Sequence, residues 1–307
     1  MRIAVMGTGG IGGYFGGRLA QGGADVAFIA RGKMLAALKK DGLRIKSQLG
    51  DLHLHSVVAT DDPKQLGPVD LVVFGVKLWD TEEAARLITP LVSGEAAVIS
   101  FQNGVDKDDV LRGVLGDRAI IGGLSYIAAT IAEPGVIAHS GSMQRLVFGE
   151  YDKRRSRRCE DFLEACRRGK IDAEISDDIE REIWEKFVFL VGLSGTTAPI
   201  RTPIGPIRSN AQTRAFLLDV MREVVAVGRA KGVALAPDYA EKRLAFCDTV
   251  PAAMTSSMAV DLERGNRLEV PWLSGGVVKL GAALSTPAPL NRAISDILAL
   301  HAEGRTA

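Results

Sequence analysis

The chain opens with an apolar segment that runs directly into a glycine-rich turn. Residues 2–6 read RIAVM and residues 7–12 read GTGGIG. A buried strand followed at once by the spacing G-x-G-x-x-G and a helix is typical of a dinucleotide-binding turn. Gly7 would permit the tight turn, Gly9 the close approach of a pyrophosphate, and Gly12 the packing of helix on strand. The spacing predicts a parallel α/β domain at the start of the chain.

The helix after this turn would offer free N–H groups and the positive end of its dipole to phosphates. The residues predicted to contact the cofactor here are Gly7, Thr8, Gly9, Gly10, Ile11 and Gly12. A glycine-rich turn without a ligand is the alternative. The strand before the turn, the helix after it and the next apolar segment at residues 24–31 favour the dinucleotide site.

The end of the second predicted strand indicates which dinucleotide binds. A site for NAD usually carries Asp or Glu about 20 residues beyond the glycines, where it binds the ribose 2′-hydroxyl. This chain has Arg31 and Lys33 there instead. A guanidinium can bind a 2′-phosphate with two N–H groups, whereas a carboxylate would repel it. We therefore predict NADP(H) as the cofactor; an arginine that only solvates the strand end is the alternative.

Apolar runs alternate with a helical pattern through the first half of the chain. Residues 69–76 and 96–101 read as strands buried on both faces, and residues 80–91 between them have helical periodicity. Further strands are predicted at residues 119–121, 136–139 and 146–149, with a hairpin about Gly50 formed by residues 43–45 and 52–58. This alternation predicts a doubly wound sheet of the Rossmann type.

Strand patterns stop in the second half of the chain, and amphipathic helices follow. Their starts are marked by Asp178, Asn210 and Asp238. We expect an NADP-binding domain over residues 1–172 and an all-helical domain over residues 173–307, which is an ordinary size for each.

The composition argues against several classes of partner. The formal net charge of +1 disfavours a protein that binds nucleic acid or a membrane surface, and the basic run at residues 153–158 reads as a solvated loop. The three cysteines and four histidines lack metal-ligand spacing. No apolar stretch reaches the ~20 residues that span a bilayer, and a strand that begins at residue 2 leaves no room for a secretory signal. We expect a cytoplasmic protein without a metal.

Two polar residues follow predicted strands of the sheet. Lys77 comes directly after the strand at residues 69–76, and Asn103 follows the strand at residues 96–101. Ligands of open α/β sheets bind beyond the carboxyl ends of the strands, so both side chains are expected to reach cofactor or substrate. A surface charge at Lys77 and an Asn-Gly turn at Asn103 are the alternatives.

Lys186 lies in a predicted helix, where a polar segment changes to an apolar one. An ammonium at this place could bind a substrate carbonyl oxygen and donate its proton as hydride reaches the carbon. A lysine whose charged end extends to solvent from the helix flank is the alternative.

Several motifs occur along the whole chain in the order found in the ketopantoate reductase family. They are the glycine turn with Arg31, Val76–Lys77, Gln102–Gly104, EIWEK at residues 182–186, TSSM at residues 255–258 and LEVP at residues 268–271. The chain resembles members of this family from end to end. The resemblance implies the reduction of 2-dehydropantoate, a small-molecule 2-keto acid, to (R)-pantoate with NADPH, a step of pantothenate biosynthesis.

The resemblance also implies roles for five side chains. Lys186 matches the catalytic general acid, and Glu269 matches the carboxylate that binds the substrate hydroxyl and orients the lysine. Asn103 matches an active-site amide, Ser257 a substrate-binding hydroxyl, and Lys77 a cofactor or substrate contact; Asn103 and Glu269 are also expected to contact the cofactor. Taken singly, Glu269 could be a solvated charge and Ser257 a hydroxyl at a helix N-terminus.

The chain departs from the family where members carry asparagines. Four and eight residues after the catalytic lysine it has Leu190 and Ser194, and a third asparagine aligns nearest to Ile204. Ser194 is predicted to contact the substrate. Loss of amide hydrogen bonds leaves a more apolar pocket and can change specificity, so the identity of the 2-keto acid stays open.

Two further functions stay open. One is a related NADP-dependent hydroxy-acid or opine-like dehydrogenase, and the other is a catalytically inactive NADPH sensor. The joint presence of Lys186, Asn103 and Glu269 disfavours the sensor, which needs no proton donor. The apolar segment at residues 277–284 suits either a core helix or a homodimer interface.

Overall fold

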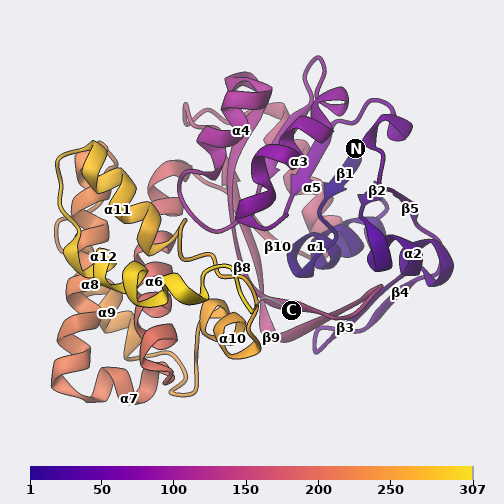
Figure 1. Ribbon diagram of the computed structural model, residues 1–307. Helices are drawn as coiled ribbons and strands as arrows, with labels where there is room; N and C mark the ends of the chain where they lie inside the picture. Colours follow the sequence, from indigo (N-terminus) through magenta and orange to yellow (C-terminus); the bar gives the residue numbers. More distant parts are fainter. Residues whose placement is uncertain (306–307) are drawn as a thin grey trace. The chain divides into compact units, whose positions relative to one another are not determined.

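The computed structural model describes residues 1–305, which divide into two compact units (Figure 1). The first unit comprises residues 1–103 and 107–179, and the second comprises residues 104–106 and the chain from Glu180 onward. Residue 172, where the first domain was expected to end, is the first residue of a strand in the first unit. The domain limits 1–172 and 173–307 stay a prediction.

The first unit is built on a mixed sheet, which has ten strands among the described residues. The strands are β1 (Arg2–Met6), β2 (Asp25–Ile29), β3 (Leu43–Ser47), β4 (Leu52–Leu54), β5 (Val58–Thr60), β6 (Leu71–Phe74), β7 (Ala97–Ser100), β8 (Ile120–Glu133), β9 (Val136–Gly149) and β10 (Asp172–Ile175). Their order is β4-β3-β9-β8-β7-β6-β1-β2-β5, with β10 paired to β9. The strands from β8 through β5 pair in parallel, whereas β8 with β9 and β3 with β4 pair antiparallel.

Helices pack on both faces of this sheet. They are α1 (Gly10–Gln21), α2 (Gly32–Asp41), α3 (Thr81–Ile88), α4 (Lys107–Leu115) and α5 (Arg157–Arg168). Ile3 and Val5 of β1 join the apolar cluster of α1, α2 and α5, while Ala4 and Met6 join that of α3 and α4. Successive side chains of a strand point to opposite faces, so a strand covered on both sides is apolar throughout. The doubly wound α/β architecture is therefore confirmed.

Two details of the strand prediction are wrong. The predicted strand at residues 52–58 is split, because β4 forms the hairpin with β3 about Gly50 while β5 pairs in parallel with β2 at the other edge. The predicted strands at residues 136–139 and 146–149 are one strand, β9, with a bulge opposite β8. Residues 140–143 between them are exposed, so they lack the apolar pattern that would have joined the two segments.

The second unit is helical over its described length, as expected. Its helices are α6 (Ile179–Ile200), α7 (Ile204–Ser209), α8 (Ala211–Ala230), α9 (Tyr239–Cys247), α10 (Ser257–Arg264), α11 (Ser274–Ala283) and α12 (Pro289–Leu298). The side chain of Asn210 accepts hydrogen bonds from the N–H groups of Gln212 and Thr213, so it caps α8 at the predicted start. Trp184 and Phe187 of α6 meet edge to face, 5.7 Å between ring centroids, inside the unit's apolar core.

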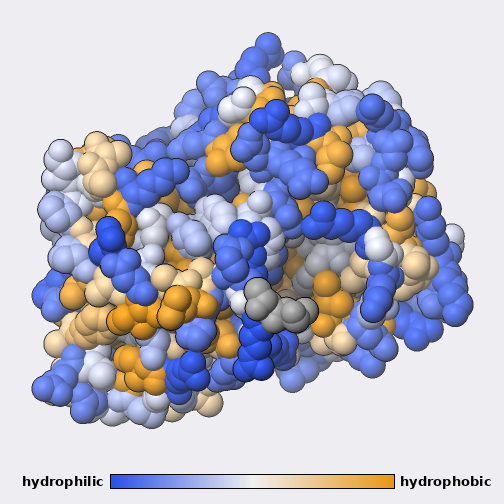
Figure 2. All heavy atoms as spheres, viewed as in Figure 1, coloured by the Kyte–Doolittle hydropathy of each residue, from blue (hydrophilic) through white to orange (hydrophobic). Residues whose placement is uncertain are grey.

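The surface carries both polar and apolar side chains. Hydrophilic residues cover much of the face seen in Figure 2, and apolar residues gather near α12 of the helical unit. Ile297 and Leu300 are the most exposed large apolar side chains there, at 61% and 94%. Within residues 1–305, the helices are all too short or too polar to cross a bilayer.

Candidate active site

Three glycines of the first turn differ in how much space a side chain would find beside them. Gly7 has a φ of +92°, and a Cβ on it would lie 2.8 Å from Val76 Cγ1. A Cβ on Gly12 would lie 2.2 Å from the carbonyl oxygen of Gly7. A Cβ on Gly9, in contrast, would meet no heavy atom within 4 Å. The fold itself therefore requires Gly7 and Gly12, whereas the space beside Gly9 is open.

The backbone at the start of α1 resembles an anion-binding site. Gly9 is the residue before the helix, it has no capping side chain, and the first turn of α1 contains no acidic residue. The N–H groups of this turn can therefore bind an anion from outside the helix. Thr8 is buried and donates its hydroxyl to the carbonyl of Ile29 at 3.3 Å, which ties the turn to β2.

Arg31 lies at the end of β2 and directly precedes α2. Its side chain is 77% exposed, and its Nη2 lies 3.3 Å from Oδ2 of Asp80, before α3. An exposed ion pair of this kind stabilises a fold little, so the guanidinium is held loosely and can bind another anion. Its predicted role toward a ribose 2′-phosphate stays a prediction.

Lys77 and Asn103 follow two neighbouring parallel strands. Phe74 ends β6 and pairs with Ser100, which ends β7, and each predicted residue lies three positions beyond its strand. Both therefore lie at the carboxyl edge of the sheet, as predicted. Lys77 is exposed, with Nζ 5.5 Å from the ring centroid of Trp79, and Asn103 is half-buried.

A buried ion pair, which was not predicted from the sequence, lies just after Asn103. Lys107 Nζ donates to Asp108 Oδ2 at 2.8 Å and to the carbonyl of Ser100 at 3.1 Å, and both charged side chains are at most 3% exposed. Tyr151 donates its hydroxyl to the same Asp108 oxygen at 2.6 Å. Burial, and then the charge of Asp108, raise the pKa of Tyr151 far above its usual range. Charges at residues 107–109 would ordinarily indicate a solvated helix start.

Lys186, Leu190 and Ser194 lie four residues apart along α6, so they share one face of that helix. Lys186 and Leu190 are half-buried, while Ser194 is 1% exposed and donates its hydroxyl to the carbonyl of Leu190. A serine that bonds to its own helix in this way has used its donor. Ile204 is fully buried at the start of α7.

The last two predicted site residues, Ser257 and Glu269, lie near the starts of α10 and α11. Ser257 is exposed and is the first residue of α10, but the capping hydroxyl belongs to Ser256, which accepts from the Ala259 N–H at 3.0 Å. Ser257 therefore lies at a helix N-terminus, as its alternative interpretation expected, but it is not the capping residue. Glu269 is half-buried and precedes a turn, since its carbonyl accepts from Trp272 and Leu273. Helix α11 begins after this turn, at Ser274.

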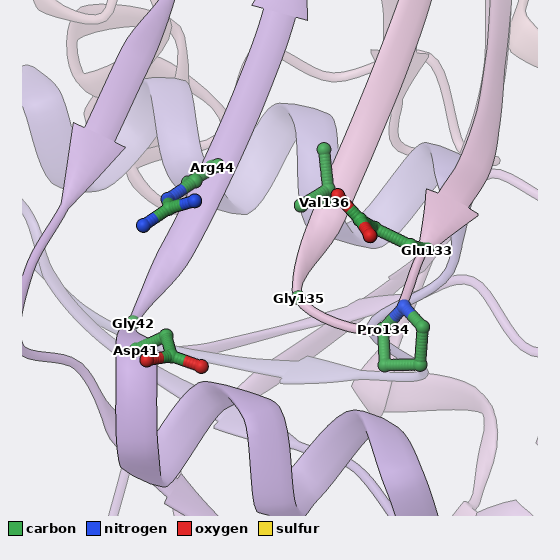
Figure 3. A pocket seen from close by; sticks show the side chains of 7 residues that line it. All are labelled: Asp41, Gly42, Arg44, Glu133, Pro134, Gly135 and Val136. Atoms are coloured by element: carbon green, nitrogen blue, oxygen red, sulfur yellow. The ribbon is translucent and has the colours of Figure 1, made fainter.

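A small pocket of about 150 Å³ lies elsewhere in the first unit, at the turn between β8 and β9 (Figure 3). Asp41 at the end of α2, Arg44 on β3 and Glu133 at the end of β8 contribute its charged groups. No predicted site residue lines it. Nor do residues 1–305 contain a cluster of three or more His, Cys, Asp or Glu that could hold a metal ion.

A doubly wound sheet with a glycine turn after its first strand, followed by a helical unit, is an arrangement found in nicotinamide-dependent oxidoreductases. Residues 3–153 match the family described as "Ketopantoate reductase PanE/ApbA", and residues 178–302 match "Ketopantoate reductase PanE/ApbA C terminal". The chain belongs to this ketopantoate reductase family, which confirms the resemblance predicted from its motifs.

Relatives match the chain along almost its whole length. The 2-dehydropantoate 2-reductase of Archaeoglobus fulgidus is 33% identical over 97% of this chain and 96% of its own. The uncharacterized oxidoreductase YkpB of Bacillus subtilis is 31% identical over 94% and 95%. The crystal structure of a PanE/ApbA family ketopantoate reductase from Ralstonia eutropha superposes with a TM-score of 0.89 at 33% identity, covering 98% of each chain.

Proposed function

We propose that this protein reduces a 2-keto acid to a 2-hydroxy acid with NADPH, and that 2-dehydropantoate is its substrate. The observation that carries the proposal is the family match over both parts of the chain. A relative named for this reaction is 33% identical over nearly the full length. The open space beside Gly9 and the exposed guanidinium of Arg31 support a phosphorylated dinucleotide in the first unit.

Two groups of the first unit would hold the cofactor. N–H groups at the start of α1 bind the pyrophosphate, because no side chain of the turn competes for them. Arg31 binds the 2′-phosphate with the N–H groups that Asp80 does not engage. When bound, the cofactor supplies the hydride for the reduction.

The side chains proposed for chemistry have complementary roles. The ammonium of Lys186 binds the keto oxygen, stabilises the negative charge that develops there and donates a proton to it. The carboxylate of Glu269 binds the substrate hydroxyl and favours the charged form of Lys186. Asn103 and Ser257 hydrogen-bond the substrate, and Lys77 contacts substrate or cofactor.

The first experiment is a rate measurement with purified protein, NADPH and a panel of 2-keto acids, followed by loss of NADPH absorbance. We expect the highest kcat/KM with 2-dehydropantoate, and a loss of turnover of about 10²-fold or more in Lys186→Ala with little change in the Kd of NADPH. If this variant turns over as fast as wild type, Lys186 takes no part in the chemistry. Tight NADPH binding without turnover of any 2-keto acid would indicate the sensor instead.

A second experiment tests the cofactor. Arg31→Asp should raise the Kd of NADPH much more than that of NADH, because the new carboxylate repels only the 2′-phosphate. Lys39→Asp, an exposed change of the same charge near the other end of α2, serves as a comparison for a general change of charge. An unchanged ratio of the two Kd values in Arg31→Asp would reject the proposed role.

The face of α6 favours a second candidate, a related NADP-dependent hydroxy-acid dehydrogenase that interconverts a more apolar 2-keto acid and its 2-hydroxy acid. Leu190 follows Lys186 by one turn, and the hydroxyl of Ser194 donates to its own helix. This face therefore offers few donors for a polar substrate. If this candidate is correct, 2-keto acids with apolar side chains will exceed 2-dehydropantoate in kcat/KM, and Leu190→Asn will shift the preference back by roughly 10-fold.

A further inference from the structure

Gln102 directly precedes Asn103 and is almost completely buried, at 4% exposure. Its Nε2 donates to the carbonyl of Val76 at 3.0 Å and to the hydroxyl of Thr81 at 2.8 Å. Its Oε1 accepts from the hydroxyl of Ser100 at 2.9 Å. Both N–H groups and the carbonyl of one side chain are thus engaged inside the first unit, and its amide orientation follows from them.

These hydrogen bonds hold the backbone on both sides of Lys77. The Val76 carbonyl, just before Lys77, accepts directly from Gln102. The Leu78 carbonyl, just after it, accepts at 2.7 Å from Thr81, whose own oxygen accepts from Gln102. One amide therefore fixes the segment that carries Lys77.

The same amide also fixes the start of the Asn103 turn. Ser100 is the last residue of β7, and its hydroxyl holds the side chain of Gln102 within two residues of the strand end. The network consequently joins the ends of β6 and β7 by side chains, beyond the last backbone pair of the two strands, Phe74 with Ser100.

We infer that Gln102 is a positioning residue, which sets the backbone of Lys77 relative to that of Asn103. The inference rests on the proposed function, because Gln102 would affect the reaction only by positioning Lys77 and Asn103, the two residues proposed to contact cofactor and substrate. No other standard side chain of this length supplies two N–H donors and one acceptor in a plane. Displacing a positioned group by about 1 Å can lower turnover by roughly 10²-fold.

The test compares Gln102→Met with Gln144→Met. Methionine keeps the length of glutamine but has no N–H donor. Gln144 on β9 donates to the carbonyl of Lys170 at 3.0 Å, so its variant also removes an amide-to-carbonyl bond, in a different part of the first unit. The values of kcat, KM and the NADPH Kd are measured at a temperature where circular dichroism shows both variants folded.

We expect kcat of Gln102→Met to fall by roughly 10- to 100-fold and the NADPH Kd to rise, with both unchanged in Gln144→Met. Gln102→Glu is the second variant, in case the methionine variant does not fold. Protonation of this carboxyl group restores an O–H donor toward Val76 or Thr81, so its deficit in kcat relative to wild type should shrink as the pH falls. A deficit that does not change with pH would count against the inference.

If Gln102→Met has the same kcat and NADPH Kd as wild type, the inference is overturned, whatever the melting temperature of the variant. If wild type itself shows no NADPH binding or turnover, the proposed function fails instead. Hydrogen exchange of residues 76–78, followed by mass spectrometry, then decides separately whether Gln102 fixes this segment. Faster exchange in Gln102→Met than in Gln144→Met supports the inference, and equal exchange contradicts it.

Discussion

Gly9→Ala should separate cofactor binding from folding. Gly9 has φ −86° and ψ −160°, which alanine adopts without strain, and the added Cβ would meet no heavy atom within 4 Å. A glycine replaced by alanine at a compatible position stabilises a fold by about 0.4–1 kcal/mol. The methyl group would nevertheless occupy space that the pyrophosphate is proposed to use. Separating the phosphate from even one charge-assisted N–H bond removes roughly 1.5–3 kcal/mol, which corresponds to a Kd raised about 10- to 150-fold.

Gly10→Ala is the matched control for this prediction. A Cβ on Gly10 would lie 2.2 Å from the carbonyl oxygen of Ala129 and 2.7 Å from its carbonyl carbon. Both atoms are backbone of β8, so the helix or the strand must shift, at about 1–3 kcal/mol. Melting curves and NADPH titration calorimetry should therefore show a stable Gly9→Ala that binds poorly, and a destabilised Gly10→Ala. Wild-type affinity in Gly9→Ala would refute the placement of the pyrophosphate.

Three other predictions concern buried groups of both units. Lys107→Met leaves the carboxylate of Asp108 buried without its cation, and urea unfolding should show a loss of about 3–5 kcal/mol. Arg158→Met should destabilise the protein at pH 7. Burial raises the pKa of Glu150, but hydrogen bonds from Arg158 and Ser156, together with the nearby positive charges, lower it overall. The difference from wild type should therefore shrink below about pH 4, as Glu150 takes up a proton. Burial raises the pKa of Cys247 to about 11, so a disulfide reagent should label it slowly at pH 8 and faster as the pH rises.

Each of these predictions has a result that would contradict it. Lys107→Met together with Asp108→Asn should recover part of the loss, since the asparagine carries no charge; a double variant as unstable as the single one would show that the charge is not the cause. A difference for Arg158→Met that stays constant from pH 7 to acid would exclude Glu150. Rapid labelling of native Cys247 at neutral pH would show that its side chain is accessible.

The positions of several strands along the chain and the glycine turn could be predicted, because both leave short-range patterns in the sequence. β1, β6 and β7 are buried on both faces, so each reads as an uninterrupted apolar run. The long β8–β9 ribbon was missed in part because its middle is exposed and bulged. A bulge is set by pairing with a distant strand, and a single sequence carries no record of that pairing.

Polar groups buried by the fold were harder to predict than apolar ones. Lys107, Asp108 and Gln102 have residue types that are normally exposed, and nothing in their neighbours marks them otherwise. Their burial becomes visible only when Ser100, Val76 and Tyr151 are placed around them by the sheet. Lys186 and Glu269 were proposed from resemblance, and their roles stay predictions for the same reason: sequence spacing gives no distance between them.

Cofactor binding and substrate choice are proposed to depend on different physical features of this chain. At the glycine turn, backbone groups are proposed to bind the cofactor. Gly7 and Gly12 leave no room for a side chain, and the space beside Gly9 is open. On α6, Leu190 and Ser194 stand where the resemblance leads us to expect amides, and the helix backbone continues unbroken through both positions. A change of side chain on a regular helix disturbs little else, whereas a change in the turn disturbs the sheet. Substrate preference can therefore diverge within this family while the cofactor site stays the same, which is why family membership defines the reaction more closely than the substrate.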